Sequence, residues 1–328
     1  MPVTTRRHLA SLVAAVSLAS PRLARAQDAF PARPIRLVVP WPPGGGVDVL
    51  ARILQQPLGA QLGQPVIIDN IGGGSGRIGN QAAARAAPDG YTLLLVNDTF
   101  AATEALPVAG TASQRDAFTP VALAITASQG IFTHPRSGLR TIQDLAAAAR
   151  ARPGSLNVGV PGIGSSQHLT SELLLRAAGD LRVEHVPYRG GGPLLLDLMA
   201  GSIDAGVVTF GAAAGQAASG QLIPLVVSGG ERPAAFPNVP TAAESIAPGF
   251  VQTTWMGLLA PVGTPDAPIA RVHAALRATL ADPEVVVRMG QVGYDPSGLN
   301  GRGFGQLFND TIAQFASIAA ERGITSQS

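Results

Sequence analysis

The chain has 328 residues, 46% of them hydrophobic, and a formal net charge of +2 at pH 7. It contains no cysteine and no lysine, which excludes disulfides, cysteine-ligated metals, phosphate-loop lysines and serine–lysine acylation sites. The arginines are scattered along the chain, so no basic cluster indicates nucleic-acid binding.

Residues 1–26 have the pattern of a cleaved export signal. Arg6 and Arg7 precede the uncharged run Leu9–Ser20, and a small-x-small triplet ends at Ala26. The paired arginines also match a twin-arginine export signal. The segment holds four of the 23 basic residues and none of the 21 acidic ones, so the mature chain is nearly neutral. We therefore expect a periplasmic protein.

After the signal, short apolar runs alternate with Ala- and Leu-rich segments of helical period, which is typical of α/β units. The 302 residues left after removing 26 from 328 are enough for two lobes. We expect 27–125 plus 251–328 to form lobe 1 and 126–250 to form lobe 2, joined by ordered strands. The predicted strands are Ile35–Pro40, Val66–Asp69, Thr92–Val96, Val121–Ala127, Asn157–Val160, Val183–Val186, Ala205–Val208, Ile223–Val227 and Met256–Ala260.

Two later stretches need separate interpretation. The uncharged run 205–230 is long enough to suggest a membrane span, but Gly, Gln, Ser and Pro interrupt it, so it predicts a strand, a helix and a strand. The stretch 266–322 is predicted to be mostly helical, with breaks at Asp282-Pro283 and across 298–305.

Three glycine-rich loops share one chemistry, because each follows a predicted strand and opens a predicted helix. They cover 40–48, 70–79 and 162–168. Glycines let the backbone approach a ligand closely, and the unpaired N–H groups at a helix start favour a carboxylate or phosphate. In open α/β sheets such loops meet outside the carboxyl ends of the strands. Loops from both halves of the chain therefore predict an anion site between them.

Individual residues of these loops allow two interpretations. Asp48 either caps its own helix or contacts a ligand amine or a bridging water. Trp41 lies where its surroundings would change when a ligand binds. Ser165 and Ser166 cap a helix and can also face a bound carboxylate.

The remaining candidates also have a structural alternative. His168 lies in a first helical turn, where structural hydrogen bonding competes with a ligand role. Thr209 ends a strand and points either into the cleft or to the surface. Tyr188 either stacks at the rim or packs in the interior.

An enzyme alternative rests on the second loop. Gly74-x-Gly76-x-x-Gly79 matches the dinucleotide fingerprint, and Asp98 ends the next strand, as in an exported oxidoreductase that binds NAD or flavin. Against it, several residues separate Asp69 from Gly74, whereas the fingerprint expects its first glycine at the strand exit. No G-x-S-x-G elbow and no H-E-x-x-H spacing occurs.

Several segments match one family when they are read together. They are RPIRLVVPWPPGGGVDVLAR, QPVIIDNIGGGSGRIGNQAAARAAPDGYTLLL, FTPVALA, PGIGSSQHLTSELL, HVPYRGGGPLLLDLMAG, FPNVPTAAE and WMGLLAPVGTP. The mature chain thus resembles the extracytoplasmic solute receptors of tripartite tricarboxylate transporters, also called Bug receptors.

The resemblance implies a periplasmic-binding-protein type II-like fold whose two lobes close on a ligand in the cleft between them. It implies a non-enzymatic receptor for a small organic carboxylate, without cofactor or metal, which hands its ligand to the membrane subunits of a secondary transporter. We also expect a monomer. The implied ligand-binding residues are Trp41, Gly44, Gly45, Gly46, Asp48, Gly74, Ser75, Ser165, Ser166, His168 and Thr209.

The chain departs from the family pattern at four positions. Trp41 stands where Phe or Tyr is more usual, and Arg77 stands where Asn is frequent. Val208 and Thr209 occupy positions that often hold Asp and Asn. If Arg77 turns inward, its guanidinium adds a bidentate contact and predicts a preference for dicarboxylates.

Overall fold

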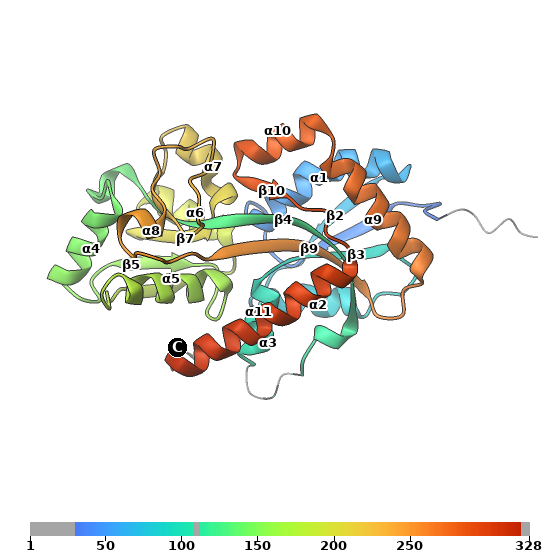
Figure 1. Ribbon diagram of the computed structural model, residues 1–328, viewed down its shortest axis with the longest axis horizontal. Helices are drawn as coiled ribbons and strands as arrows, with labels where there is room; N and C mark the ends of the chain where they lie inside the picture. The colour runs from blue at the N-terminus through green and yellow to red at the C-terminus, as the bar shows by residue number, and fades with distance from the viewer. Residues whose placement is uncertain (1–29, 108–109, 111, 323–328) are drawn as a thin grey trace, which may run out of the picture.

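The computed structural model describes residues 30–107, 110 and 112–322, and the predicted signal at 1–26 lies outside this part. The described residues form two α/β lobes side by side (Figure 1), which confirms the predicted fold class. Within this part of the chain one sheet runs through both lobes in the order β2-β1-β3-β9-β4-β7-β5-β6, and β8 and β10 pair with β4.

The first lobe contains one half of this sheet. β1 pairs in parallel with β2 and β3, and β3 pairs antiparallel with β9. Helices α1, α9 and α10 cover one face, and α2, α3 and α11 cover the other (Figure 1). The bounds are β1 Ile35–Val39, α1 Gly46–Leu62, β2 Val66–Asn70, α2 Arg77–Ala84, β3 Thr92–Asn97, α3 Thr99–Ala105, η1 Arg115–Ala117, α9 Asp266–Leu280, α10 Pro283–Gln291, β10 Tyr294–Pro296 and α11 Gly301–Arg322.

The second lobe contains the other half. β5 pairs in parallel with β6 and β7, and β7 pairs antiparallel with β4. Helices α4, α5 and α8 pack on one face, and α6 and α7 pack on the other. The bounds are η2 Pro135–Ser137, α4 Ile142–Ala151, β5 Asn157–Val160, α5 Ser166–Ala177, β6 Glu184–Pro187, α6 Gly191–Ala200, β7 Ala205–Thr209, α7 Phe210–Ala218, β8 Ile223–Val227 and α8 Ala242–Ser245.

Two long strands connect the lobes. β4 (Phe118–Thr133) and β9 (Thr253–Pro261) are paired antiparallel from Phe118 to Ser128. From Gln129 onward β4 pairs with β7 and β8 instead. The change of partner lies three residues beyond the predicted lobe boundary at 125/126, whose position stays a prediction.

All nine predicted strands are found, eight of them within three residues of their expected bounds, whereas β4 continues six residues past Ala127 to Thr133; the run 205–230 forms β7, α7 and β8 as predicted. The C-terminal region differs in two ways. β10 was not predicted, because only its antiparallel pairing with β4 makes it a strand. The predicted break across 298–305 ends early, since α11 begins at Gly301; a Cβ there would overlap the carbonyl oxygen of Pro120, so close packing requires this glycine.

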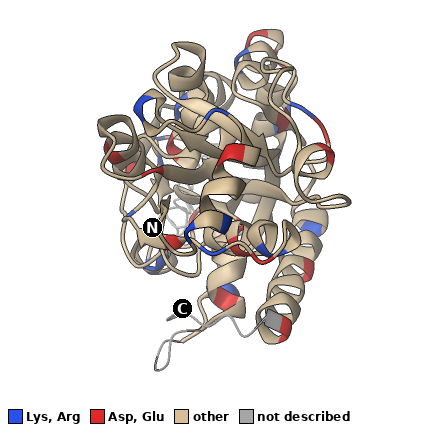
Figure 2. Ribbon diagram, turned by 90° about the vertical axis from the view of Figure 1, so that its left-hand side faces the viewer, with Lys and Arg blue, Asp and Glu red and all other residues tan. Residues whose placement is uncertain are grey.

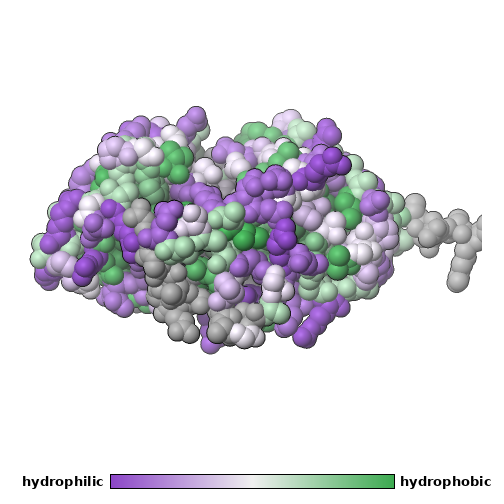
Figure 3. Space-filling view, turned by 60° about the horizontal axis from the view of Figure 1, so that its bottom comes forward, coloured by the Kyte–Doolittle hydropathy of each residue, from purple (hydrophilic) through white to green (hydrophobic). Residues whose placement is uncertain are grey.

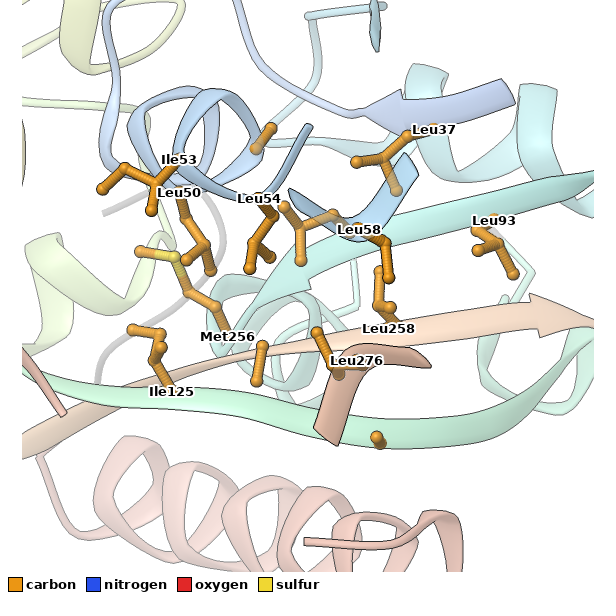
Figure 4. Close-up of a cluster of buried hydrophobic side chains, with 14 of the residues drawn as sticks. Leu37, Leu50, Ile53, Leu54, Leu58, Leu93, Ile125, Met256, Leu258 and Leu276 are labelled. Carbon is orange, nitrogen blue, oxygen red and sulfur yellow. The ribbon is translucent and has the colours of Figure 1, made fainter. Parts of the chain in front are cut away.

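The core of the first lobe orients α1 toward the site. Leu50, Leu54 and Leu58 recur every fourth residue, lie on one face of α1 and are fully buried (Figure 4). They pack in one cluster with Leu258 of β9 and Leu276 of α9. Burial of such a leucine contributes about 1.5–3 kcal/mol. This packing fixes the axis of α1, so its N-terminus points at a defined place between the lobes.

Candidate functional site

The starts of α1 and α6 and the end of β7 meet between the lobes. Gly45 approaches Gly191 so closely that a Cβ on Gly45 would lie 3.6 Å from the Gly191 nitrogen. A narrow cavity of about 20 Å³ lies beside this contact. Figure 3 shows a notch between the two lobes. The residues that line the cavity are Trp41, Gly45, Gly46, Val47, Asn97, Pro161, Gln167, Gly191, Val208 and Thr209.

Asp48 holds the first loop in shape. Its carboxylate accepts hydrogen bonds from the Gly44 nitrogen at 2.9 Å, Arg52 Nε at 2.8 Å and Asn70 Nδ2 at 3.0 Å. Burial alone would raise the pKa of Asp48, but the hydrogen bonds from Arg52, Gly44 and Asn70 outweigh burial and lower it below its usual value. Asp48 therefore supports the loop from behind and does not line the cavity.

The start of α1 is fixed with its amides directed into the gap. α1 begins at Gly46, so the N–H groups of its first turn have no acceptor within the helix. The hydroxyl of Tyr294 donates to the Gly46 carbonyl at 2.9 Å. Thr209 lies opposite, because a Cβ on Gly46 would be 2.8 Å from the Thr209 Cβ.

Trp41 forms part of the cavity wall. Its ring lies against Gly76 and Gly190, where added Cβ atoms would be 3.6 and 3.5 Å from ring carbons. The side chain is 5% exposed, and its Nε1–H has no hydrogen-bond partner among the described residues. A buried indole N–H normally finds an acceptor, so this donor without a partner is an exception in the wall of the cavity.

The second loop contacts the third loop and does not line the cavity. Gly74, Ser75 and Gly76 all have positive φ angles, of 59°, 52° and 91°. The turn carries Ser75 across the gap, where its hydroxyl donates to the Ile163 carbonyl at 3.1 Å. Ser75 thus joins the lobes, and Gly74 belongs to the turn that carries it.

The third loop is tied down by its own side chains. Ser165 caps α5 by accepting from the His168 nitrogen at 3.2 Å, and His168 Nδ1 accepts from the Gly164 nitrogen at 3.2 Å. Burial, together with the neighbouring His185, lowers the pKa of His168 to about 4. Ser165, Ser166 and His168 therefore lie behind the cavity wall, whereas Gln167 lines it.

A hydrogen-bonded chain of neutral side chains crosses between the lobes. Asn97 Nδ2 donates to Thr99 Oγ1 at 3.2 Å, and that oxygen lies 3.2 Å from Ser166 Oγ. Ser166 Oγ donates to Gln167 Oε1 at 3.2 Å, and Gln167 Nε2 donates to Thr209 Oγ1 at 3.3 Å. The chain links the cavity-lining residues of both lobes in this closed conformation.

Asp98 lies beside this chain and is 1% exposed. Its Oδ1 accepts from Thr254 Oγ1 at 2.7 Å, and its Oδ2 has no partner among the described residues. Burial raises the pKa of Asp98 to about 7, although the hydrogen bond from Thr254 and the nearby Ser166 hydroxyl oppose the shift.

His168, Glu172 and His185 form the one His/Asp/Glu group in the described residues whose ligand atoms lie close enough, within 4.8 Å, to hold a metal ion. His168 Nδ1 accepts an N–H, so the neutral ring carries its proton on Nε2. Glu172 Oε1 lies 3.1 Å from His185 Nδ1, and Ser171 Oγ lies 2.9 Å from His185 Nε2. These contacts explain the cluster as a hydrogen-bonded support for α5 and β6.

The glycine fingerprint has a packing explanation. A Cβ on Gly79 would lie 2.5 Å from the Ile71 carbonyl oxygen and 2.6 Å from the Pro40 Cα, so Gly79 lets α2 pack closely. β2, which precedes the loop, is at the edge of the sheet. The nucleotide crevice of a Rossmann fold instead lies where the strand order reverses, inside the sheet.

The side chains of Arg77 and Tyr188 both have partners within the protein. The hypothesis that Arg77 turns into the cleft is wrong, because Arg77 Nη2 donates to the Thr103 carbonyl at 2.6 Å and the residue is absent from the cavity wall. Burial lowers the pKa of Arg77, and Glu104 opposes this. Tyr188 donates to Asp197 Oδ2 at 2.9 Å, so its hydroxyl is already satisfied.

Comparison with known proteins identifies the family of this chain. The model of the tripartite tricarboxylate transporter family receptor matches residues 50–324. The chain belongs to this receptor family. It is 33% identical over 316 residues to protein BugT of Bordetella pertussis, covering 95% of each chain. Homologues of this family are receptors and not enzymes, so the oxidoreductase alternative is set aside.

Two solved structures carry ligands. MatC from Rhodopseudomonas palustris with bound malate is 30% identical, has a TM-score of 0.81 and covers 88% of this chain and 99% of its own. An R. palustris protein with adipate is also 30% identical, has a TM-score of 0.85, and covers 90% of this chain and 99% of its own. In the part of this receptor that the structure describes, no helix is long and apolar enough to cross a membrane.

Sequence reasoning missed six of the ten residues of the cavity wall. Val47, Asn97, Pro161, Gln167, Gly191 and Val208 were not proposed as ligand-binding residues. Asn97 and Pro161 directly end or follow predicted strands, and that position is a usable signal. Gln167 was overlooked because the two serines before it explain the start of α5 without it.

Proposed function

We propose that this receptor captures a small mono- or dicarboxylate between its lobes and delivers it to the membrane subunits of a secondary transporter. The export signal at 1–26 supports a periplasmic location, which is where receptors of this family work. We further propose that the mature receptor acts as a monomer without cofactor or metal, and that lobes 27–125 plus 251–328 and 126–250 move as units.

One observation carries the proposal. None of the ten residues that line the cavity is charged, yet they include the start of α1, whose first amides have no acceptor within the helix, and Trp41, whose buried Nε1–H has no partner among the described residues. The positive end of the α1 dipole and these donors favour a carboxylate without a cationic side chain. A ligand with three negative charges would meet no side-chain cation in this wall.

The proposed roles follow the geometry. Trp41, Gly45 and Gly46 present donors and let the ligand approach the backbone, and Gly44, whose N–H is bonded to Asp48, holds the loop in place behind them. Thr209 borders the ligand from the second lobe. Gly74 and Ser75 close the gap against the third loop, which Ser165, Ser166 and His168 hold in shape.

Ligand entry requires the lobes to separate. The cavity of 20 Å³ is much smaller than the roughly 300 Å³ or more of ordinary ligand sites. β4 and β9 cross between the lobes and supply the connection about which opening takes place. Binding then shifts the population from open to closed.

A thermal-shift panel on the mature protein tests the function. It contains mono-, di- and tricarboxylates, including malate and adipate, together with amino acids, and NAD and flavin as controls. We expect a small carboxylate to raise the midpoint of unfolding, since ligand at about 100 times its Kd adds about 2.7 kcal/mol of apparent stability. A shift with NAD or flavin alone, or with no acid at all, would refute the proposal.

A further inference from the structure

Asp98 is a buried acid at the junction of the lobes. It is not a member of the hydrogen-bonded chain that runs from Asn97 to Thr209. It precedes α3 and follows the cavity-lining Asn97. Its nitrogen donates to the Trp255 carbonyl of β9 at 3.2 Å, which anchors it to a crossing strand. One carboxyl oxygen is paired with Thr254, and the other is buried without a partner among the described residues.

The second lobe covers this carboxyl group in the closed conformation. Thr99, the next residue, accepts from the Ser166 backbone nitrogen at 3.2 Å and lies 3.2 Å from the Ser166 hydroxyl. These contacts place the first turn of α5 over the start of α3. Separation of the lobes, as proposed above, moves α5 away from the start of α3 and so uncovers the side of Asp98 that Ser166 faces.

Among the residues that the structure describes, no charged group compensates Asp98. The groups that face it are the hydroxyls of Thr254 on β9 and Ser166 on α5 and the backbone amide of Thr99. The charged groups on the elements packed around it have other partners: Glu104 accepts from the Gln114 nitrogen, and His168 and Glu172 interact with His185. Burying a carboxylate without a neighbouring cation costs free energy of desolvation. An acid in such a place lowers this cost by binding a proton and becoming neutral.

We propose that Asp98 is a positioning residue that takes up a proton as α5 closes over it, so that carboxylate capture is coupled to proton uptake. The inference rests on the proposed function, because it assigns the closing movement to ligand capture. Asp98 does not line the cavity and acts through Thr254 and Ser166. When its carboxyl group is protonated, Asp98 places no negative charge beside the hydrogen-bonded chain from Asn97 to Thr209. That chain then holds the lobes together.

The direction of the pH effect follows from the two states. The pKa of Asp98 is raised from 3.8 to about 7 in the closed form, and water restores an ordinary value in the open form. Between these values only the closed form holds the proton. At about pH 6, capture takes up about one proton, and the affinity at about pH 8.5 is about tenfold weaker than at about pH 6.

Calorimetric titration with malate at about pH 6, in two buffers of different ionisation enthalpy, measures the protons bound with the ligand. The wild type, Asp98→Asn and the exposed control Asp310→Asn are compared. We expect an uptake close to one proton in the wild type and the control. Asp98→Asn should still bind malate, with less uptake and a flatter pH profile of affinity.

The outcomes separate the two proposals. Malate binding without proton uptake in the wild type, or equal uptake in Asp98→Asn, overturns the role of Asp98 and leaves the receptor function standing. If malate does not bind, the best acid of the panel replaces it; if no acid binds, the receptor function fails and this inference fails with it. Carbon-13 NMR of the ligand-saturated wild type gives a check without a variant, because an Asp98 carboxyl that titrates like an exposed aspartate contradicts the inference.

Discussion

Ser75 in the first lobe donates its hydroxyl to the carbonyl of Ile163 in the second, at 3.1 Å. This bond joins the second and third glycine-rich loops, and Ser75 makes it from a left-handed conformation with φ of 52°. Such a backbone costs a residue with a Cβ about 1–2 kcal/mol. The contact therefore stabilises closure while straining the loop that makes it.

Replacing Ser75 separates these two effects. Ser75→Ala and Ser75→Gly both remove the hydroxyl, so both should weaken ligand binding by a factor of about 2 to 10, equivalent to about 0.5–1.5 kcal/mol. Ser75→Gly also relieves the strain and should be more stable to unfolding than Ser75→Ala by about 1 kcal/mol. Calorimetric titration and urea unfolding measure the two quantities. Unchanged affinity in both variants would show that this bond does not contribute to closure.

Gly46 limits how closely the lobes approach. A Cβ on Gly46 would lie 2.8 Å from Thr209 Cβ and 3.2 Å from Met256 Cε, so Gly46→Ala should prevent full closure. We expect its affinity to fall at least about tenfold, while the fold survives because alanine is a better helix former than glycine by about 1 kcal/mol.

The matched control for this change is Gly215→Ala in α7, where an added Cβ meets nothing within 4 Å. It should keep the wild-type affinity. Equal affinities of Gly46→Ala and Gly215→Ala would argue against the contact between Gly46 and Thr209 in the bound state.

Asp48→Asn tests how the first loop is held. The pKa of Asp48 is lowered in the folded state, so its stabilising effect is present above the unfolded value of 3.8 and is lost as the pH falls through the folded value. At neutral pH the variant should lose about 1–3 kcal/mol of unfolding free energy. Urea unfolding across acidic and neutral pH measures this loss.

The difference between wild type and Asp48→Asn should shrink in acid, where the wild-type carboxyl is also protonated. Asp310→Asn, at an exposed position, is the control and should show little difference at any pH. A difference for Asp48→Asn that stays constant from neutral to strongly acidic pH would mean that the charge of Asp48 does not hold the loop.

The fold follows from local patterns to a large degree. Apolar runs such as Leu93–Val96 are buried on both faces of the sheet, so the strands can be predicted from the sequence. β10 escaped prediction because Tyr294–Pro296 is a strand only through its partner β4. Figure 2 likewise agrees with the scattered charge pattern, since residues of both signs are interspersed over the face it presents.

The site was only partly predictable. The loop that starts α1 could be found, because Gly44 to Gly46 follow a strand and precede a helix. The direction of a long side chain could not be predicted from the sequence. Arg77 binds the end of α3 because the Thr103 carbonyl is within its reach. Asp98 was noticed only as part of a nucleotide fingerprint; its burial depends on β9 and α5, which are distant in sequence.

The crystal structure of the mature receptor with the best acid of the panel tests the central claim most directly. We predict a carboxylate between the lobes that accepts hydrogen bonds from backbone nitrogens at the start of α1, with Trp41 Nε1 at hydrogen-bonding distance of the ligand. An acid bound on an outer face of either lobe, or a carboxylate neutralised by an arginine away from Gly46, would contradict the account.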